Sequence, residues 1–250
     1  MFEKLKIVSL SIDRLSFHES LDKVMQWGLS HTPAYVCFAN VHMTIEAYKD
    51  PLFLEQLNNA SLVVADGKPI AVASNILHGK KQERISGMDF MPRILEAANT
   101  AKASIFLYGS SDHVLEVLQK KIAITYPAVK IGGAVSPPFR ALELSEQEAY
   151  INQMNESGAN LVFVALGCPK QEKWMANNYK KINATLLGVG GAFPVVAGIH
   201  KRSPEWMQRW GLEWLYRLIQ EPRRMFKRYL YTNSYFLWLL AKEKLKTKPG

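Results

Sequence analysis

The sequence has little cysteine and no long hydrophobic run. Of its 250 residues only Cys37 and Cys168 are cysteines, and they do not form a CxxC pair. This excludes a disulfide scaffold and a cysteine-rich zinc site, and it is typical of a reducing compartment. Nowhere do about 18 uncharged apolar residues run together, so we expect no segment to span a bilayer. Because the first residues also lack the apolar stretch of a signal peptide, we expect the protein to stay in the cytoplasm.

The common nucleotide and metal motifs are absent as well. The sequence contains no GxGxxG, GxxxxGK[ST], HExxH or DxD pattern, and its six histidines lack metal-ligand spacing. We therefore expect no metal and no other cofactor. The missing GxGxxG also disfavours one alternative function, a nucleotide-binding oxidoreductase on a Rossmann-like sheet. If the substrate carries a diphosphate, arginine and lysine side chains must neutralise it.

Short β-rich runs alternate with longer helical patterns through most of the chain. The predicted strands are Lys6–Ser11, Ala34–Ala39, Ser61–Ala65, Ser104–Tyr108, Val129–Gly132, Leu161–Leu166 and Thr185–Val189. Helices are predicted from Phe17, where Ser16 and Glu19 can form a capping box, and at about 89–100, 111–124, 145–157 and 170–180. Apolar strands that alternate with helices indicate an α/β fold, with a mostly parallel, Rossmann-like sheet flanked by helices.

Residues 199–250 differ from residues 1–198 in pattern and charge. We expect 1–198 to form an α/β catalytic core and 199–250 a helical appendage, with helices from Pro204 to about Leu218 and then to about Lys246. Residues 201–250 hold 12 of the 31 basic residues, 4 of the 22 acidic residues and 10 of the 27 aromatic residues. Such a basic, aromatic tail favours an anionic membrane surface over its alternatives, which are nucleic acid or ordinary packing on the core.

Polar or glycine-rich residues follow five of the predicted strands. Ligands of parallel α/β sheets bind beyond the carboxyl ends of the strands, so we expect these residues to form the site. They are Asn40, Asp66, Tyr108 with Gly109, Gln171, and Gly190 with Gly191. Asp66 could act there as a general base, or it could cap the helix that follows it. The glycine turns could bring backbone N–H groups close to phosphate, although many such turns serve only the chain reversal.

Three arginines are candidates for binding a phosphate or a carboxylate. Arg84 lies between two helical segments, and Asp89 is expected to cap the second of them. In the tail, Arg217 and Arg224 fall near one helical stripe if the helix continues through Pro222. A planar guanidinium can hold two phosphate or carboxylate oxygens at once, which makes these positions suitable for an anionic substrate.

Six segments in a fixed order carry a resemblance to a known family. They are Ala65-Asp-Gly67, Arg84-Ile-Ser-Gly-Met-Asp89, Leu166-Gly-Cys-Pro-Lys-Gln-Glu-Lys-Trp174, Gly188-Val-Gly-Gly-Ala-Phe193, Arg202-Ser-Pro-Glu-Trp206 and Gly211-Leu-Glu-Trp-Leu-Tyr-Arg-Leu-Ile-Gln-Glu-Pro-Arg-Arg224. Together they resemble the WecG/TagA/CpsF glycosyltransferases, glycosyltransferase family 26, over almost the whole chain. The last two segments are the most specific.

The resemblance implies an inverting, metal-independent glycosyltransferase. Members of the family extend polyprenyl-diphosphate-linked sugars during surface polysaccharide or teichoic acid assembly. The best-known donor is UDP-N-acetylmannosamine, and relatives use other UDP-hexoses such as UDP-glucose. The resemblance also implies that the tail brings the enzyme to the inner face of the membrane, and it suggests a homo-oligomer.

The resemblance assigns roles residue by residue. It makes Asp66 the catalytic base and places Asn40, Arg84 and Gln171 in the same pocket. It implies that Arg217 and Arg224 of the tail close over the diphosphate of the sugar donor. Three positions depart from the family pattern around this pocket, and they are Phe38 in place of threonine, Pro138 in place of tyrosine and Pro194 in place of aspartate. The resemblance therefore does not fix which sugar is transferred.

Overall fold

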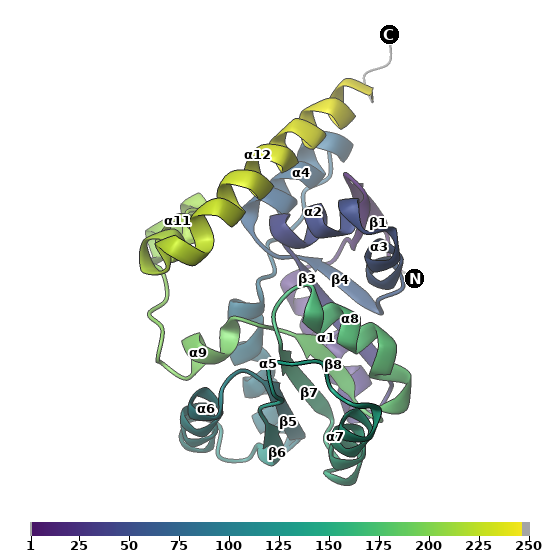
Figure 1. The fold of residues 1–250 in the computed structure, drawn as a ribbon, viewed down its shortest axis with the longest axis vertical. Coiled ribbons are helices and arrows are strands. Elements are labelled where there is room, and N and C mark those ends of the chain that lie inside the picture. Colours follow the sequence, from purple (N-terminus) through teal and green to yellow (C-terminus); the bar gives the residue numbers. More distant parts are fainter. Residues whose placement is uncertain (1, 247–250) are drawn as a thin grey trace.

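A sheet of six parallel strands lies at the centre of the molecule (Figure 1). The structure is a computed structural model that describes residues 2–246, apart from the side chains of Arg209, Arg224 and Met225. The strand order is β4-β3-β8-β7-β5-β6. The strands are β3 Ala34–Ala39, β4 Leu62–Ala65, β5 Ser104–Gly109, β6 Lys130–Val135, β7 Leu161–Ala165 and β8 Thr185–Gly188. The predicted α/β fold with a parallel sheet is confirmed.

Helices cover both faces of this sheet. They are α1 Phe17–Leu29, α2 Val41–Lys49, α3 Pro51–Asn58, α4 Lys68–His78, α5 Gly87–Ala101, α6 Asp112–Thr125, α7 Leu144–Glu156, α8 Lys170–Asn178, α9 Ala192–Val196, α10 Glu205–Trp210, α11 Glu213–Gln220 and α12 Pro222–Lys246, with a 3-10 turn at Tyr179–Lys181. Neighbouring residues of β3 such as Tyr35 and Val36 belong to two separate buried clusters, because successive strand side chains point to opposite faces. The capping box predicted at Ser16 and Glu19 is present at the start of α1.

The predicted first strand, Lys6–Ser11, is wrong. The chain there forms a two-stranded antiparallel hairpin of β1 Lys4–Ile7 and β2 Leu10–Asp13, separate from the parallel sheet. Val8 lies in the turn with φ of 62°. A β-branched residue rarely adopts this left-handed conformation, so the apolar run carries no turn signal that would split it.

Two predicted helix ends are also corrected. Asp89 does not cap α5, because Ser86 occupies the cap position and its Oγ accepts the N–H of Asp89 at 3.2 Å. In the tail, the helix expected from Pro204 to about Leu218 is two helices, α10 and α11. Gly211 separates them with φ of 74°, a conformation that glycine adopts without a steric penalty.

The last helix, α12, packs across α2 and α4 (Figure 1). Its residues Phe236, Leu239 and Leu240 are buried within the same cluster as residues of β3 and β4. The second half of α12 therefore completes the core on this face of the sheet. Within residues 2–246, no helix has both the length and the apolarity needed to cross a bilayer.

Replacing Phe236 with alanine is expected to lower the free energy of unfolding by about 3–5 kcal/mol, because a fully buried ring is lost and a cavity remains. Urea unfolding followed by circular dichroism measures this change. Phe226 lies on the same helix and is 58% exposed, so Phe226→Ala serves as the matched control and should change the value by less than about 0.5 kcal/mol. Equal effects of the two substitutions would contradict this packing of α12.

Candidate active site

Asn40 and Asp66 lie side by side at the carboxyl ends of two adjacent strands. The strands β3 and β4 pair in parallel with Ala39 opposite Ala65, and the N–H of Asp66 donates to the Ala39 carbonyl oxygen at 2.8 Å. Asn40 is also the N-cap of α2, where its Oδ1 accepts the N–H of Met43 at 3.1 Å. The cap leaves the amide NH₂ of Asn40 to donate to the carboxylate of Asp66. Helix capping thus sets the orientation of the group that holds Asp66.

The environment of Asp66 keeps its carboxyl group poised to exchange a proton. Burial raises the pKa of Asp66 to about 7, and the nearby Glu213 carboxylate adds to this shift. The guanidinium groups of Arg217 and Arg84 and the hydrogen bond from Asn40 oppose it without cancelling it. Helix α4 takes Gly67 as its N-cap, so Asp66 precedes the capping position. The carboxyl group is therefore left for chemistry near neutral pH.

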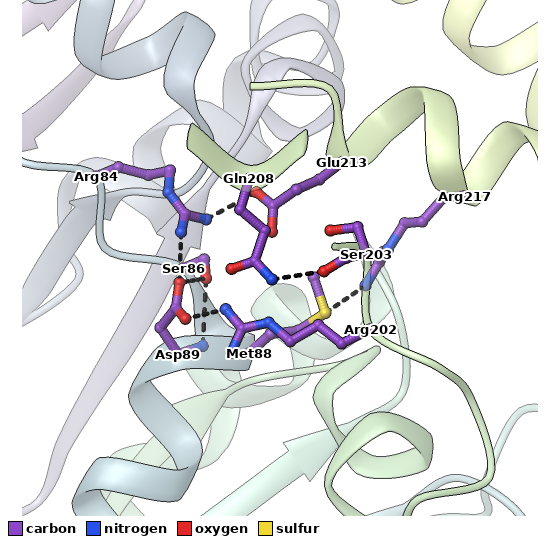
Figure 2. Close-up of polar contacts among 9 residues, drawn as sticks. All are labelled: Arg84, Ser86, Met88, Asp89, Arg202, Ser203, Gln208, Glu213 and Arg217. Atoms are coloured by element: carbon purple, nitrogen blue, oxygen red, sulfur yellow. Dashed lines mark hydrogen bonds and ion pairs between the residues drawn. The ribbon is translucent and has the colours of Figure 1, made fainter. Parts of the chain in front are cut away.

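Arg84 joins two carboxylates that come from distant parts of the chain. Its Nη1 donates to Glu213 Oε2 at 2.8 Å, and its Nη2 donates to Asp89 Oδ2 at 2.7 Å (Figure 2). Asp89 also forms an ion pair with Arg202 and accepts the hydroxyl of Ser86 at 2.6 Å. In this state Arg84 ties the start of α5 to α11, and both ends of its guanidinium are engaged by protein carboxylates.

Glu213 is a site residue that the sequence analysis missed. It is half-buried at the first position of α11, and burial raises its pKa. Its Oε1 is buried and has no hydrogen-bond partner among the described residues. An acidic residue in the first turn of a helix is common because it favours the helix dipole, so its sequence position alone gave no signal of a site.

Arg217 reaches the same site from the next turn of α11. Glu213 and Arg217 are four residues apart, so both side chains leave the same face of the helix. Arg217 Nη2 lies 3.2 Å from Met88 Sδ (Figure 2). A Cβ at Gly191 would lie 3.0 Å from Nη2, so the absence of a side chain there makes room for the guanidinium. Among the described residues, no carboxylate forms an ion pair with Arg217, which leaves its charge for a substrate anion.

Gln171 lies beneath the turn that follows β8. It is 5% exposed, and its Nε2 donates to the Gly188 carbonyl oxygen at 2.8 Å and to Glu172 Oε1 at 2.6 Å. Its Oε1 is 3.1 Å from the position that a Cβ of Gly190 would occupy. The N–H of Gly190 donates to the Val164 carbonyl oxygen at 3.1 Å. This amide is therefore already engaged, whereas the sequence had suggested that it could bind phosphate.

The structure does not bring the side chain of Tyr108 to this site. Its ring is fully buried, stacked on Trp174 with a centroid distance of 4.5 Å. Gly109 has φ of 108°, and a Cβ there would lie 2.5 Å from the Ala165 carbonyl oxygen, so packing between β5 and β7 already requires glycine. The side chain of Arg224 lies outside the described residues. Its helix, α12, begins only after a break at Glu221, so the helical stripe expected to join Arg224 to Arg217 is not continuous.

Two cavities border the Arg84–Glu213 ion pair, with Arg84 in the wall of the larger and Glu213 in the wall of the smaller. The larger, of about 600 Å³, is lined by Lys68, Ala71, Val72, Asn75, Lys81, Gln82, Arg84, Glu205 and Gln208. The smaller, of about 110 Å³, is lined by Met88, Gly191, Pro194, Val195, His200, Lys201, Arg202, Ser203, Glu213, Tyr216, Arg217, Gln220 and Glu221. Of the three departures from the family pattern, Pro194 borders the smaller cavity, and Phe38 packs against Phe90 in the core.

The side chains that act on Asp66 are mainly the cationic Arg84 and Arg217 and the amide of Asn40. Among residues 2–246, no group of three or more histidine, cysteine, aspartate or glutamate side chains is placed to hold a metal ion. Glu213, whose charge acts on Asp66, is paired with Arg84, and so is Asp89. A carboxyl group poised near neutral pH beside an unpaired guanidinium can remove a proton while the guanidinium stabilises a departing anion.

Comparison with known proteins identifies the family of this chain. The model of the glycosyl transferase WecG/TagA/CpsF family matches residues 5–250. The chain is 35% identical to the N-acetylglucosaminyldiphosphoundecaprenol N-acetyl-beta-D-mannosaminyltransferase of Bacillus subtilis strain 168, over 85% of this chain and 81% of that protein. Proteins of the same description from Bacillus spizizenii and Staphylococcus aureus strain MW2 are 30% and 27% identical, over 86% and 99% of this chain and 82% and 96% of their own lengths. The chain belongs to the WecG/TagA/CpsF family of glycosyltransferases.

Proposed function

We propose that this protein transfers a sugar from a UDP-linked donor to a polyprenyl-diphosphate-linked acceptor in the assembly of a surface polysaccharide or teichoic acid. The names of its relatives support a lipid-linked acceptor and N-acetylmannosamine as the transferred sugar. UDP-N-acetylmannosamine is the first donor to consider, and UDP-glucose is the second. The observation that carries the proposal is Asp66, whose pKa of about 7 and position at the carboxyl end of β4 suit a general base.

The chemistry is a single displacement. The carboxylate of Asp66, oriented by the amide of Asn40, takes the proton of an acceptor hydroxyl group. The oxygen attacks the anomeric carbon of the donor from the face opposite to UDP. The bond between that carbon and the β-phosphate oxygen breaks, and UDP leaves with the electron pair. The anomeric configuration is inverted because the reaction has one displacement.

Arg217 stabilises the leaving group. Its guanidinium lies against Gly191 in the smaller cavity, so the donor diphosphate can contact both the charge and the backbone there. A fixed cation at the place where negative charge develops lowers the barrier without reorganisation during the step. The guanidinium supplies this charge in place of a metal ion, and no cofactor takes part.

The tail places the enzyme on the inner face of the cell membrane. Trp206, Trp210 and Trp238 are each more than half exposed on α10 and α12, and Arg223 and Lys227 are exposed on α12. Aromatic rings favour the headgroup region, and basic side chains favour anionic lipids. Assembly into a homo-oligomer stays a prediction, and we expect no nucleic-acid partner.

The experiment that tests this function is a transfer assay with a panel of UDP-sugars and a prenyl-diphosphate-linked N-acetylglucosamine acceptor. One donor is expected to give product, and the rate should stay within about twofold when EDTA is added, because an arginine supplies the cation. NMR of the product is expected to show an inverted anomeric centre. Transfer that EDTA abolishes, or a retained configuration, would contradict the proposed mechanism. Absence of transfer from every UDP-sugar would contradict the function.

A further inference from the structure

Arg84 lies beside Asp66 because a backbone hydrogen bond joins the segments that carry them. The N–H of Ile85 donates to the Ala65 carbonyl oxygen at 2.8 Å, so the residues around Arg84 run along the end of β4. Ile85 is fully buried, which anchors this segment in the core. The charge of Arg84 accordingly acts on the carboxyl group of Asp66. An arginine next to a buried carboxyl group is expected to form an ion pair with it.

The guanidinium of Arg84 is turned to two other carboxylates instead (Figure 2). Its Nη1 donates to Glu213 at 2.8 Å, and its Nη2 donates to Asp89 at 2.7 Å. Both terminal nitrogens are thereby engaged, and within the described part of the chain Asp66 forms no ion pair with a lysine or an arginine. The guanidinium thus binds the carboxylates of α5 and α11 rather than the carboxyl group at the end of β4.

Glu213 and Asp89 differ in what they do to Asp66. Asp89 has a second cationic partner, since it also pairs with Arg202. Glu213 binds Arg84 through Oε2, and its charge acts on Asp66 directly, where it helps burial to raise the pKa. Glu213 therefore affects the proposed base in two ways, because it holds a cation back and adds a negative charge nearby.

The remaining charges around Asp66 and Glu213 act in the opposite direction. Burial raises the pKa of both carboxyl groups, and the arginines of the site oppose this rise. The charged and polar groups that face one or the other are Arg84, Asp89, Arg202, Arg217 and the amide of Asn40. Loss of the Glu213 carboxylate would leave Asp66 facing Arg217, Arg84 and Asn40, all of which lower its pKa.

We propose that Glu213 is a positioning residue of the transferase, which keeps the guanidinium of Arg84 on α11 and off Asp66, so that the base is left unpaired to accept a proton. A carboxylate in an ion pair with arginine is a weak base, because the neighbouring cation favours its ionised form. Glu213 thereby preserves the proton affinity that general-base catalysis near neutral pH requires. The importance of this role for catalysis rests on the proposed function, whereas the effect of Glu213 on Asp66 is a property of the folded chain alone.

Glu213→Gln is expected to shift the acidic limb of kcat/KM to lower pH by about one unit or more, because Arg84 is freed to pair with Asp66 and a negative charge is lost. Asp66 then stays ionised to lower pH, which gives the direction of the shift. The rate above about pH 7 should fall as well, because a weaker base takes the acceptor proton less readily. Glu213→Asp keeps the charge and should shift the limb by less than half as much. A limb within about 0.2 pH unit of the wild-type position in Glu213→Gln would overturn the proposal.

Asp89→Asn separates this role from a purely structural one. The substitution removes the other carboxylate that holds Arg84, but it leaves the ion pair between Arg84 and Glu213 in place. Its limb should stay within about 0.2 pH unit of the wild-type position, whatever its rate. Glu148→Gln, at an exposed position of α7, is the control for loss of one negative charge and should not shift the limb. Equal shifts in Glu213→Gln and Asp89→Asn would overturn the proposal and leave Glu213 a role in docking the tail only.

Carbon-13 NMR of the side-chain carboxyl groups separates failure of this inference from failure of the proposed function. The chain has six aspartates, and the signal that is missing from Asp66→Asn identifies Asp66. In the full-length wild-type protein this group is expected to titrate at about pH 7, and in Glu213→Gln about one unit lower or more. If this shift is seen but no UDP-sugar gives a product, the inference holds and the function fails. Transfer by the wild-type protein, with the same titration midpoint in both proteins, would overturn the inference alone.

Discussion

Replacing Asp66 with asparagine is expected to lower the kcat of sugar transfer by about 10²–10⁴-fold, the usual contribution of a general base. Asparagine has nearly the same shape, so the strand end and its contact with Asn40 should persist. The amide cannot accept the proton of the acceptor hydroxyl group at neutral pH. Steady-state transfer assays give kcat, and calorimetry with UDP should show that donor binding is kept within about threefold.

Asp22→Asn provides the control for this substitution. Asp22 is an exposed carboxylate on α1, 3.4 Å from His18, and the substitution removes one negative charge far from the strand ends. Its kcat is expected to equal that of the wild-type protein. If Asp66→Asn folds, binds UDP and transfers sugar within about twofold of the wild-type rate, Asp66 is not the base.

Substitution of Arg217 by alanine is expected to lower kcat by about 10²–10³-fold, because one fixed stabiliser of the departing diphosphate is lost. Its guanidinium has no carboxylate partner among the described residues, so the substitution breaks no ion pair in the free protein. Arg217→Lys should recover part of the rate, since lysine restores the charge without the planar fork. Rapid-quench measurement of a single turnover separates this chemical step from product release.

Arg93→Ala is the matched control for Arg217. Arg93 is 65% exposed on α5 and forms a local ion pair with Glu96 at 3.0 Å, so its loss should leave kcat unchanged. If Arg217→Ala changed only the KM of the acceptor, Arg217 would bind the acceptor and not the donor diphosphate, which would contradict the assignment. A rate within about threefold of wild type would remove Arg217 from the mechanism.

The strand-end part of the site could be predicted from the sequence because it depends on local pattern. Apolar runs end at Ala39 and at Ala65, and polar residues follow each of them. Parallel pairing then places Asn40 beside Asp66 without any further information. The same logic failed for Tyr108, because the last residues of a buried strand point into the core as readily as toward the crevice.

The tertiary part of the site could not be predicted in this way. Arg84 pairs with Glu213, which lies 129 residues further along the chain. That contact requires the break at Gly211 and the approach of α11 to the start of α5, where Arg217 contacts Met88, and neither follows from helical periodicity. The resemblance to the family indicated Arg84 and Arg217 but gave no account of their partners.

The tail combines two of the properties considered from its sequence, which are packing on the core and a basic, aromatic surface. Its charge and aromatic content indicated a surface helix, and exposed aromatic residues are present on α10 and α12. Ordinary packing on the core was the less favoured alternative, and it holds for the stripe of α12 that includes Phe236 and Leu239. The sequence did not show which residues of the helix are buried, because apolar and aromatic residues lie on both of its faces. One helix therefore completes the core and presents a basic, aromatic surface.

The pH dependence of kcat/KM tests the central assignment, Asp66 as the base, most directly. This ratio reports ionisations of the free enzyme, and burial raises the pKa of Asp66 to about 7 there. The carboxylate form is the active one, so kcat/KM should be constant above about pH 7 and fall about tenfold per pH unit below it. The residual activity of Asp66→Asn should lack this limb. A wild-type profile that stays flat from about pH 5 to 8, or the same limb in Asp66→Asn, would contradict the assignment.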